Sequence, residues 1–271
     1  MLYPLLCQIQ PIALKGLSFL GVVEGSAIYT HWLLDTLPRL LALMDHGWRL
    51  DQFDNLVIAD HSKPFQQAVL DQLGVRPEQV ISRRARGRLF RVEGFVHVSA
   101  PRTRFVAHPR AYQMVDAFIG GPRTRRPERR ILVSRSDARR RKIVNEDALR
   151  AELEPRGFET VRFEDLSIAQ TATLISEASH IVAPHGAGLA NLIFANPGTR
   201  VLELFSGHLS REYWTICAQQ GLDYWNLRCD GPDGPVSDEA LKKMDYFARN
   251  GLDIAVPVRQ AVDFIDNIFL A

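Results

Sequence analysis

One segment in the second half of the chain constrains the fold more than any other. An apolar run at 180–184 leads into Gly186 and Gly188, and a second apolar run at 201–205 follows a proline and a glycine. This order predicts a strand, a glycine turn, a helix, a loop and another strand. Glycines in such a turn let backbone N–H groups and the start of the helix approach an anion, most often a phosphate. The segment therefore predicts a nucleotide-diphosphate site in an α/β fold.

The side chains around this turn narrow the kind of nucleotide site. Asn191 stands where the dinucleotide fingerprint G-x-G-x-x-G has its third glycine, and the P-loop lysine is absent, which disfavours NAD and P-loop chemistry. His185 at the mouth of the turn can donate to a phosphate oxygen, and Glu203 in the next strand can accept from a ribose hydroxyl. The glycines could instead allow a helix to pack tightly on a strand. Glu203 could instead pair with a nearby arginine.

Elements of alternating type lie on both sides of a stretch rich in proline, glycine and charge at 122–130. The chain of 271 residues is long enough for two modest domains. We therefore expect two α/β lobes with parallel sheets: a first lobe at 1–121, a linker at 122–130 and a second lobe at 131–255. The final residues, 256–271, are expected to form an amphipathic helix that crosses back to the first lobe.

The spacing of apolar residues and the positions of glycines and prolines predict the individual helices and strands. In the first half, strands are expected at 55–59, 79–82 and 94–99, and helices at 31–44, 64–73 and 108–119. In the second half, strands are expected at 131–134, 159–163 and 180–183, and helices at 145–154, 167–178 and 258–269. Pro38 should bend the first helix or start a new one, and Asn145 should cap the helix that follows it.

The three cysteines, Cys7, Cys217 and Cys229, are odd in number and never spaced as C-x-x-C. They suit neither a disulfide framework nor a zinc site, and we expect reduced, structural thiols. No apolar run approaches the roughly 20 residues of a membrane span, and the first residues lack a signal-peptide pattern. The expected location is the cytoplasm, with association at the inner face of a membrane as a further expectation.

Arginines crowd two stretches, 83–91 and 123–141, although the net charge is only +2. Solvated surface is the ordinary explanation of a basic run, and nucleic acid, an anionic membrane or a phosphate pocket are the functional ones. Arg135 and Arg141 leave the first strand of the second lobe, at the sheet edge where ligands of open α/β sheets bind. Their paired N–H donors fit a phosphate and keep their charge, so both are candidate diphosphate ligands.

His31 and Asp35 are four residues apart, so on a helix they face the same way. His31 can act as a general base with Asp35 fixing its tautomer, or Asp35 can be the base alone. A polar residue that caps the start of the helix is the structural alternative.

Three blocks, 29–40, 134–146 and 184–204, together resemble the family 61 glycosyltransferases. That family includes bacterial capsule and lipopolysaccharide enzymes, plant xylan arabinosyl- and xylosyltransferases, and the animal enzyme that places N-acetylglucosamine on extracellular domains. The resemblance implies a GT-B fold of two Rossmann-like lobes, with an acceptor-side lobe at 1–121 and a nucleotide-sugar donor lobe at 131–255. It implies inverting transfer from a UDP-sugar to a glycan or lipid-linked acceptor, here in surface polysaccharide synthesis. It also implies no cofactor and no essential metal, and the sequence has no D-x-D triplet.

On this resemblance the catalytic residues would be Asp35 and His31, and the acceptor would enter between the lobes. The donor-binding residues would be Arg135, Arg141, His185, Gly186, Ala187, Gly188, Asn191 and Glu203. Only about thirty residues precede the first block, fewer than is usual in relatives. A nucleotide-sugar epimerase or hydrolase on a similar fold is the alternative enzyme. A basic protein that binds RNA or an anionic membrane is the non-enzymatic alternative; the glycosyltransferase hypothesis expects no nucleic-acid partner.

Overall fold

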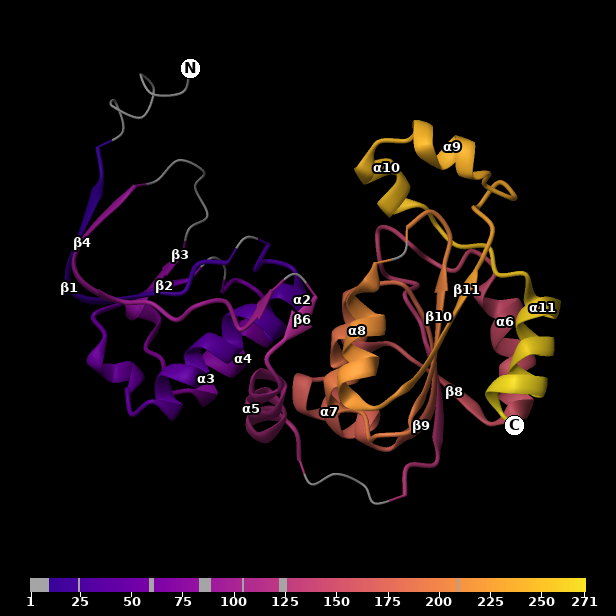
Figure 1. Cartoon of the computed structure of the whole chain (residues 1–271), viewed down its shortest axis with the longest axis horizontal. Helices are drawn as coiled ribbons and strands as arrows, with labels where there is room; N and C mark the ends of the chain where they lie inside the picture. Colours follow the sequence, from indigo (N-terminus) through magenta and orange to yellow (C-terminus); the bar gives the residue numbers. More distant parts are fainter. Residues whose placement is uncertain are drawn as a thin grey trace. The chain divides into compact units, whose positions relative to one another are not determined.

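The computed structural model divides the chain into two compact units, Met1–Phe118 and Ile119–Ala271 (Figure 1). It describes residues 10–23, 25–58, 61–82, 89–103, 105–121, 126–208 and 210–271. Residues 83–88 of the first expected arginine cluster, residues 122–125 of the expected linker and Cys7 lie outside these residues, whereas 126–141 of the second arginine cluster are described. Each unit contains a parallel sheet, so the expected mixed α/β character is confirmed for both.

The first unit is built on a four-stranded parallel sheet in the order β3-β2-β1-β4. Its strands are β1 (Ile12–Leu20), β2 (Asn55–Ile58), β3 (Val80–Ser82) and β4 (Phe90–Val96). Its helices are α2 (Tyr29–His31), α3 (Leu37–Asp45), α4 (Pro64–Gln72) and α5 (Pro109–Ile119), and a short antiparallel pair is formed by β5 (Arg102–Thr103) and β6 (Val106–Ala107).

The sequence analysis missed β1, although this strand is central in the sheet. Lys15 and Gly16 interrupt its apolar run, and the register with β4 shifts between Leu14 and Leu17. Gly16 takes a φ of +74° at this shift, a conformation that favours glycine. An irregularity of this kind removes the uniform alternation on which strand prediction depends.

A π-helical turn, Trp32–Thr36, joins α2 to α3. The N–H of Leu37 reaches back to the carbonyl of Trp32, and Pro38, which has no N–H to donate, follows directly. The expected disturbance at Pro38 is thus present as a widened turn just before it. This turn carries Asp35 and follows His31.

The second unit is a five-stranded parallel sheet in the order β11-β10-β9-β7-β8. Its strands are β7 (Arg129–Val133), β8 (Phe158–Val161), β9 (Ala178–Pro184), β10 (Arg200–Phe205) and β11 (Asp223–Arg228). Its helices are α6 (Glu146–Leu153), α7 (Ile168–Ser176), α8 (Arg211–Gln220), α9 (Asp238–Lys243), α10 (Tyr246–Gly251) and α11 (Val258–Phe264), the last continued by a π-helical turn, Ile265–Phe269. Strand β7 already contains Arg129 and Arg130, which the sequence analysis assigned to the linker.

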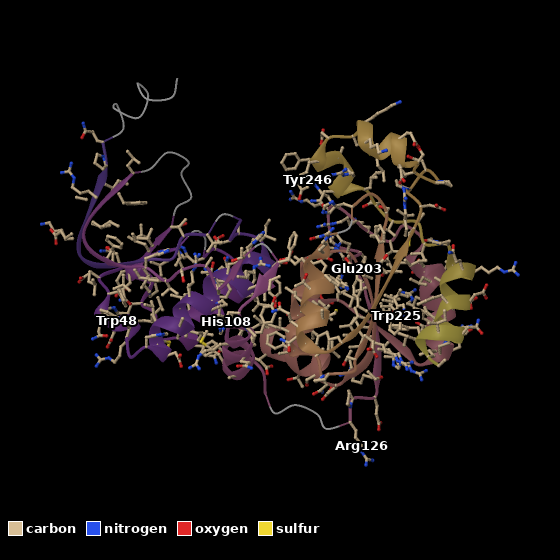
Figure 2. All side chains as sticks on the ribbon, in the orientation of Figure 1. Trp48, His108, Arg126, Glu203, Trp225 and Tyr246 are labelled. Carbon is tan, nitrogen blue, oxygen red and sulfur yellow. The ribbon has the colours of Figure 1, made fainter. Side chains whose placement is uncertain are left out.

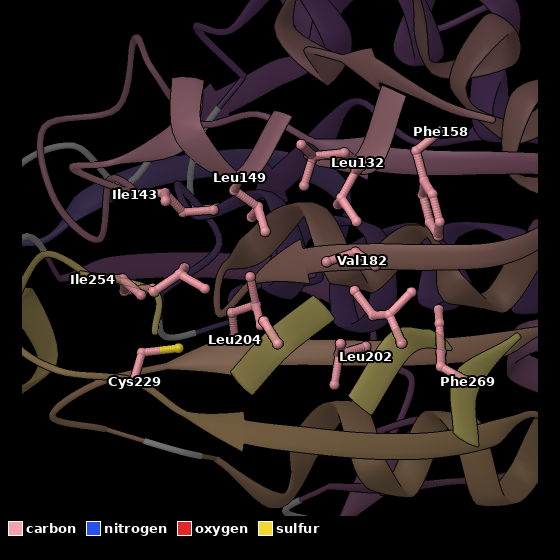
Figure 3. Packing of buried hydrophobic residues seen from close by; sticks show 14 residues of the cluster. Leu132, Ile143, Leu149, Phe158, Val182, Leu202, Leu204, Cys229, Ile254 and Phe269 are labelled. Carbon is pink, nitrogen blue, oxygen red and sulfur yellow. The ribbon is translucent and has the colours of Figure 1, made fainter. Parts of the chain in front are cut away.

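The C-terminal helix packs within the second unit. Ile265 and Phe269 belong to the same buried cluster as Leu132 on β7 and Leu149 on α6 (Figure 3). Arg156, just after α6, pairs with Asp266 at 2.7 Å. The expectation that this helix crosses back to the first lobe is therefore wrong: its apolar face covers the sheet of its own unit.

The segment after the glycine turn is helical as expected, and it is a 3₁₀ helix, Ala187–Phe194. One local expectation differs from the structure. Asn145 stands at the N-cap position of α6 without capping it, because its side chain bonds both backbone groups of Val256, at 2.8 and 2.9 Å. Asn145 thus fastens the segment before α11 to the start of α6.

Cys217 and Cys229 are free and buried, in line with the expected structural role. Burial raises the pKa of both thiols, that of Cys229 to about 12. Protonated buried thiols are inert. Among the residues that the structure describes, no helix combines the length and the apolar character that crossing a bilayer needs.

Candidate functional site

The predicted glycine turn lies at the carboxyl end of β9, next to β7 in the sheet. The backbone N–H of His185 donates to the carbonyl of Leu204 at 2.8 Å, which fixes the start of the turn to β10. The side-chain amide of Asn191 donates to the carbonyl of Gly188 at 2.9 Å, and Asn191 is buried. Asn191 therefore holds the turn in shape from inside, with its Nδ2 directed at the backbone.

Arg135 lies directly over Gly186. A methyl group built on Gly186 would approach the Nη1 atom of Arg135 to 2.2 Å, although the backbone there is extended, at φ 171°. Arg135 follows β7 and Gly186 follows β9, so adjacent parallel strands bring them to one edge of the sheet. Arg135 and Gly188 line the same small pocket with Phe163. A glycine at 186 thus makes room for a guanidinium group.

Arg141 is close enough to Arg135 for the two charges to interact. Burial lowers the pKa of its guanidinium, and the charge of Arg135 adds to that effect. Its Nη1 atom donates to Asn250 Oδ1 at 3.0 Å, whereas its Nε atom, like that of Arg135, is buried without a hydrogen-bond partner. The two arginines predicted from the sequence are therefore close enough to interact, and each has unused donor capacity.

Glu203 is in the interior of the second unit (Figure 2), with no exposed surface. One carboxylate oxygen contacts Nδ1 of His185, and the other accepts from the hydroxyl of Tyr224 at 2.6 Å. Neither oxygen faces solvent, so this placement does not offer Glu203 to a ribose hydroxyl as the sequence analysis expected. The carboxylate instead fixes the His185 ring, whose other nitrogen, Nε2, remains for a ligand.

Several aromatic and basic side chains that were not predicted as site residues lie around His185. Rings of Tyr213 and His208 lie 5.3 and 5.4 Å from the His185 ring, and Tyr246 on α10 lies 5.6 Å from His208. Arg249, also on α10, is close enough to affect the charge of His208. No motif marks these positions: α10 is about 110 residues from Arg141 in sequence, and only the fold brings the two together.

In the first unit the predicted pair is present and has a third member. Nδ1 of His31 lies 2.9 Å from Oδ2 of Asp35. Arg102 on β5 binds both oxygens of Asp35, at 2.6 and 2.8 Å, and its side chain is almost fully buried. Arg102, 67 residues from Asp35 in sequence, gave no signal in the sequence analysis.

This arrangement separates the roles of His31 and Asp35. Burial by itself would raise the pKa of Asp35, but hydrogen bonds from Arg102 and His31 outweigh it and hold the pKa below the ordinary value. A carboxylate that is already paired is a weak base. His31 is partly exposed, and its Nδ1 lies 2.9 Å from Asp35 Oδ2 and 3.1 Å from Nη2 of Arg102. The tautomer that donates Nδ1–H to Asp35 has a lone pair on Nε2. The geometry favours His31 as the base and Asp35 as the residue that orients it.

The Asp35–Arg102 pair should make the first unit sensitive to acid. Because folding lowers the pKa of Asp35, its contribution to stability is complete above the unfolded value, near 3.8, and is lost as the pH falls through the folded value. At pH 7 we expect Asp35→Asn, which leaves Arg102 buried without a counter-charge, to lower the free energy of unfolding by about 3–5 kcal/mol. Urea unfolding followed by tryptophan fluorescence should show this difference shrinking as the pH falls below about 4. A pH-independent difference would contradict the assigned pair.

Comparison with known proteins places these residues in a family. The family model for Glycosyltransferase 61 matches residues 29–202, which include His31, Asp35, Arg135, Arg141 and the glycine turn. Beta-1,2-xylosyltransferase RCN11 of Oryza sativa subsp. japonica is 31% identical over 77 residues, which are 28% of this chain and 14% of the rice protein. Since the family model covers more than half of its 271 residues, the chain belongs to glycosyltransferase family 61.

Proposed function

We propose that this protein is a glycosyltransferase that moves a sugar from a UDP-sugar to a hydroxyl of a glycan or glycolipid. The placement of Arg135 over Gly186, with Arg141 nearby, carries the proposal. In the described part of the chain neither arginine pairs with a carboxylate, and each has a buried Nε atom without a partner. Buried cations without a counter-charge are costly, so an anionic ligand is the natural complement of this site.

The second unit would bind the donor through its diphosphate. Arg135 and Arg141 would pair with phosphate oxygens, and the glycines at 186 and 188 allow the backbone to approach them. His185, whose ring is fixed by Glu203, would donate from Nε2. Glu203 enters this proposal as the residue that orients His185.

These arginines would also stabilise the leaving group. When the bond between the anomeric carbon of the sugar and the diphosphate breaks, negative charge collects on the departing UDP. Fixed guanidinium groups lower the energy of that state. Divalent metals do the same in other enzymes. We propose that transfer proceeds without an essential metal, because two permanent cations already stand at the glycine turn.

The first unit would supply the base. Nε2 of His31 takes the proton of the acceptor hydroxyl, and the oxygen attacks the anomeric carbon on the face opposite the diphosphate. The bond to UDP breaks with its electron pair passing to the phosphate oxygen, through a transition state with oxocarbenium character. The anomeric configuration is inverted. Asp35, paired with Arg102, stabilises the imidazolium that forms.

The similarity to the rice protein suggests which donor sugar to test first. Because the rice protein is named a xylosyltransferase, UDP-xylose is the first donor to test. We further propose surface polysaccharide synthesis as the setting, on the resemblance to bacterial family members. The match covers 14% of the rice protein, so it gives no basis for naming the acceptor of this chain.

The test is product analysis. The intact protein is incubated with UDP-xylose, UDP-glucose or UDP-N-acetylglucosamine and with p-nitrophenyl glycosides as acceptors, with and without EDTA. We expect UDP release that depends on the acceptor, a product of inverted anomeric configuration by NMR, and no loss of rate with EDTA. A free sugar from donor alone would indicate the hydrolase alternative, and a changed sugar still attached to UDP the epimerase. Salt-sensitive RNA binding with indifference to UDP would contradict the proposal altogether.

A further inference from the structure

Helix α10 is fastened to the loops that follow β7 and β10. Ile254, just after α10, bonds the backbone of Lys142 and Val144, and Asp253 accepts from the N–H of Lys142 at 2.9 Å. A methyl group on Gly207 would lie 2.5 Å from the carbonyl oxygen of Arg249, so this part of the loop after β10 packs directly on α10. The two loops that border the glycine turn therefore fix the position of α10.

Two residues of this helix, Tyr246 and Asn250, lie beside Arg141 of the proposed donor site. Asn250 accepts from Arg141, and its amide lies 3.4 Å from the hydroxyl oxygen of Tyr246. Arg249 is partly buried, and its Nε atom, like those of Arg135 and Arg141, is buried without a hydrogen-bond partner. Nitrogen atoms gather between the labelled Tyr246 and Glu203 in Figure 2.

The charge in this region is unbalanced. Arg135 and Arg141 are close enough for their charges to interact, and Arg141 and Arg249 both act on His208; none of the three pairs with a carboxylate among the residues that the structure covers. Fixed cations held together in a partly buried site repel one another and lose hydration. A ligand with two or more negative charges relieves both costs, which a single phosphate monoanion does only in part.

We propose that Arg249 binds the terminal phosphate of the nucleoside diphosphate together with Arg141, so that helix α10 forms part of the donor site. This inference rests on the proposed function and adds to it a third cation from the C-terminal part of the chain. Asn250 is a positioning residue for Arg141, because it accepts from Nη1 at 3.0 Å.

His208 fits the same site as a neutral donor. Burial lowers its pKa to about 4, and the charges of His185, Arg141 and Arg249 act in the same direction. At pH 7 the imidazole therefore adds no fourth positive charge to the free protein. Its N–H can still donate to a phosphate oxygen, because neutral histidine keeps one ring proton.

The test compares affinities for UDP and UMP by calorimetry with the intact protein. We expect Arg249→Ala to weaken UDP binding about 10- to 100-fold, the range for one lost charge-assisted hydrogen-bonding group, and to change UMP binding much less. The UDP-to-UMP affinity ratio should therefore fall toward one. Arg259→Ala on α11 is the matched control, because Arg259 is an exposed arginine of the same unit, and it should bind UDP as the wild type does.

The possible results separate a failure of this inference from a failure of the proposed function. If wild type binds UDP and Arg249→Ala binds it equally well, this inference is overturned while the proposed function stands. If wild type binds no nucleotide, the proposed function itself fails. Arg249→Lys keeps the charge and much of the packing, so it covers the case in which the alanine variant does not fold. It should retain part of the UDP preference, and a UDP-to-UMP ratio equal to that of the wild type would contradict the contact between the Arg249 guanidinium and the phosphate.

Discussion

Replacing His31 by alanine is expected to lower kcat for sugar transfer by about 10²- to 10⁴-fold, the usual contribution of a general base. The prediction follows from the division of roles in the first unit. Asp35 has both oxygens bound by Arg102 and one also near His31, and these contacts hold its pKa below the ordinary value. His31 is the member with an available lone pair. The KM for the UDP-sugar should change little, because the residues proposed to bind the donor lie in the other unit.

Two further variants make this prediction specific. His46→Ala removes an exposed histidine at the end of α3 and should leave kcat unchanged. Asp35→Asn should also lower kcat, because the asparagine no longer stabilises the imidazolium. If His31→Ala retained near-normal turnover while Asp35→Asn lost it, the carboxylate would be the base and the assignment made here would be wrong.

Gly186→Ala is expected to weaken UDP binding about 10- to 100-fold without unfolding the protein. The backbone at 186 is extended, at φ 171°, which alanine adopts without strain. The new methyl group would stand 2.2 Å from Nη1 of Arg135, so the guanidinium must move away from the turn. Loss of its charge-assisted hydrogen bonds costs about 1.5–3 kcal/mol, which corresponds to the stated change in affinity.

A double-mutant cycle tests whether the glycine acts through the arginine. Arg135→Ala alone should weaken UDP binding by a similar factor, and the double variant should be no weaker than Arg135→Ala. Gly121→Ala is the control, since a methyl group there meets nothing within 4 Å. Additive effects of Gly186→Ala and Arg135→Ala would mean that the glycine contributes separately and that the packing argument is wrong.

Local pattern was enough to predict much of the second unit. Its buried parallel strands contain short apolar runs, as in β7 and β9, and glycines or prolines separate several of them from the helices. The proximity of Arg135 to the glycine turn was foreseeable for the same reason. Both follow parallel strands, whose carboxyl ends share one edge of the sheet. Strand β1 escaped prediction because Lys15 and Gly16 break its pattern.

Contacts between distant parts of the chain could not be predicted in this way. Arg102 neutralises Asp35 across 67 residues, and Asn250 reaches Arg141 across 109. Glu203 was predicted to bind a ribose hydroxyl or to pair with an arginine, whereas its burial and its contacts with His185 and Tyr224 depend on how β9, β10 and β11 align. The C-terminal helix carried an amphipathic pattern that fixes which face is buried, and not which sheet it covers.

The central claim is that the second unit binds a nucleoside diphosphate, and the melting temperature of the intact protein tests it most directly. A ligand that binds only the folded state must raise that temperature. The temperature is measured with UDP, GDP, CMP and dTDP and with their sugar conjugates, each at the same concentration. We predict a clear rise with UDP and UDP-sugars that is lost in Arg135→Ala. No rise with any of these nucleotides would contradict the account.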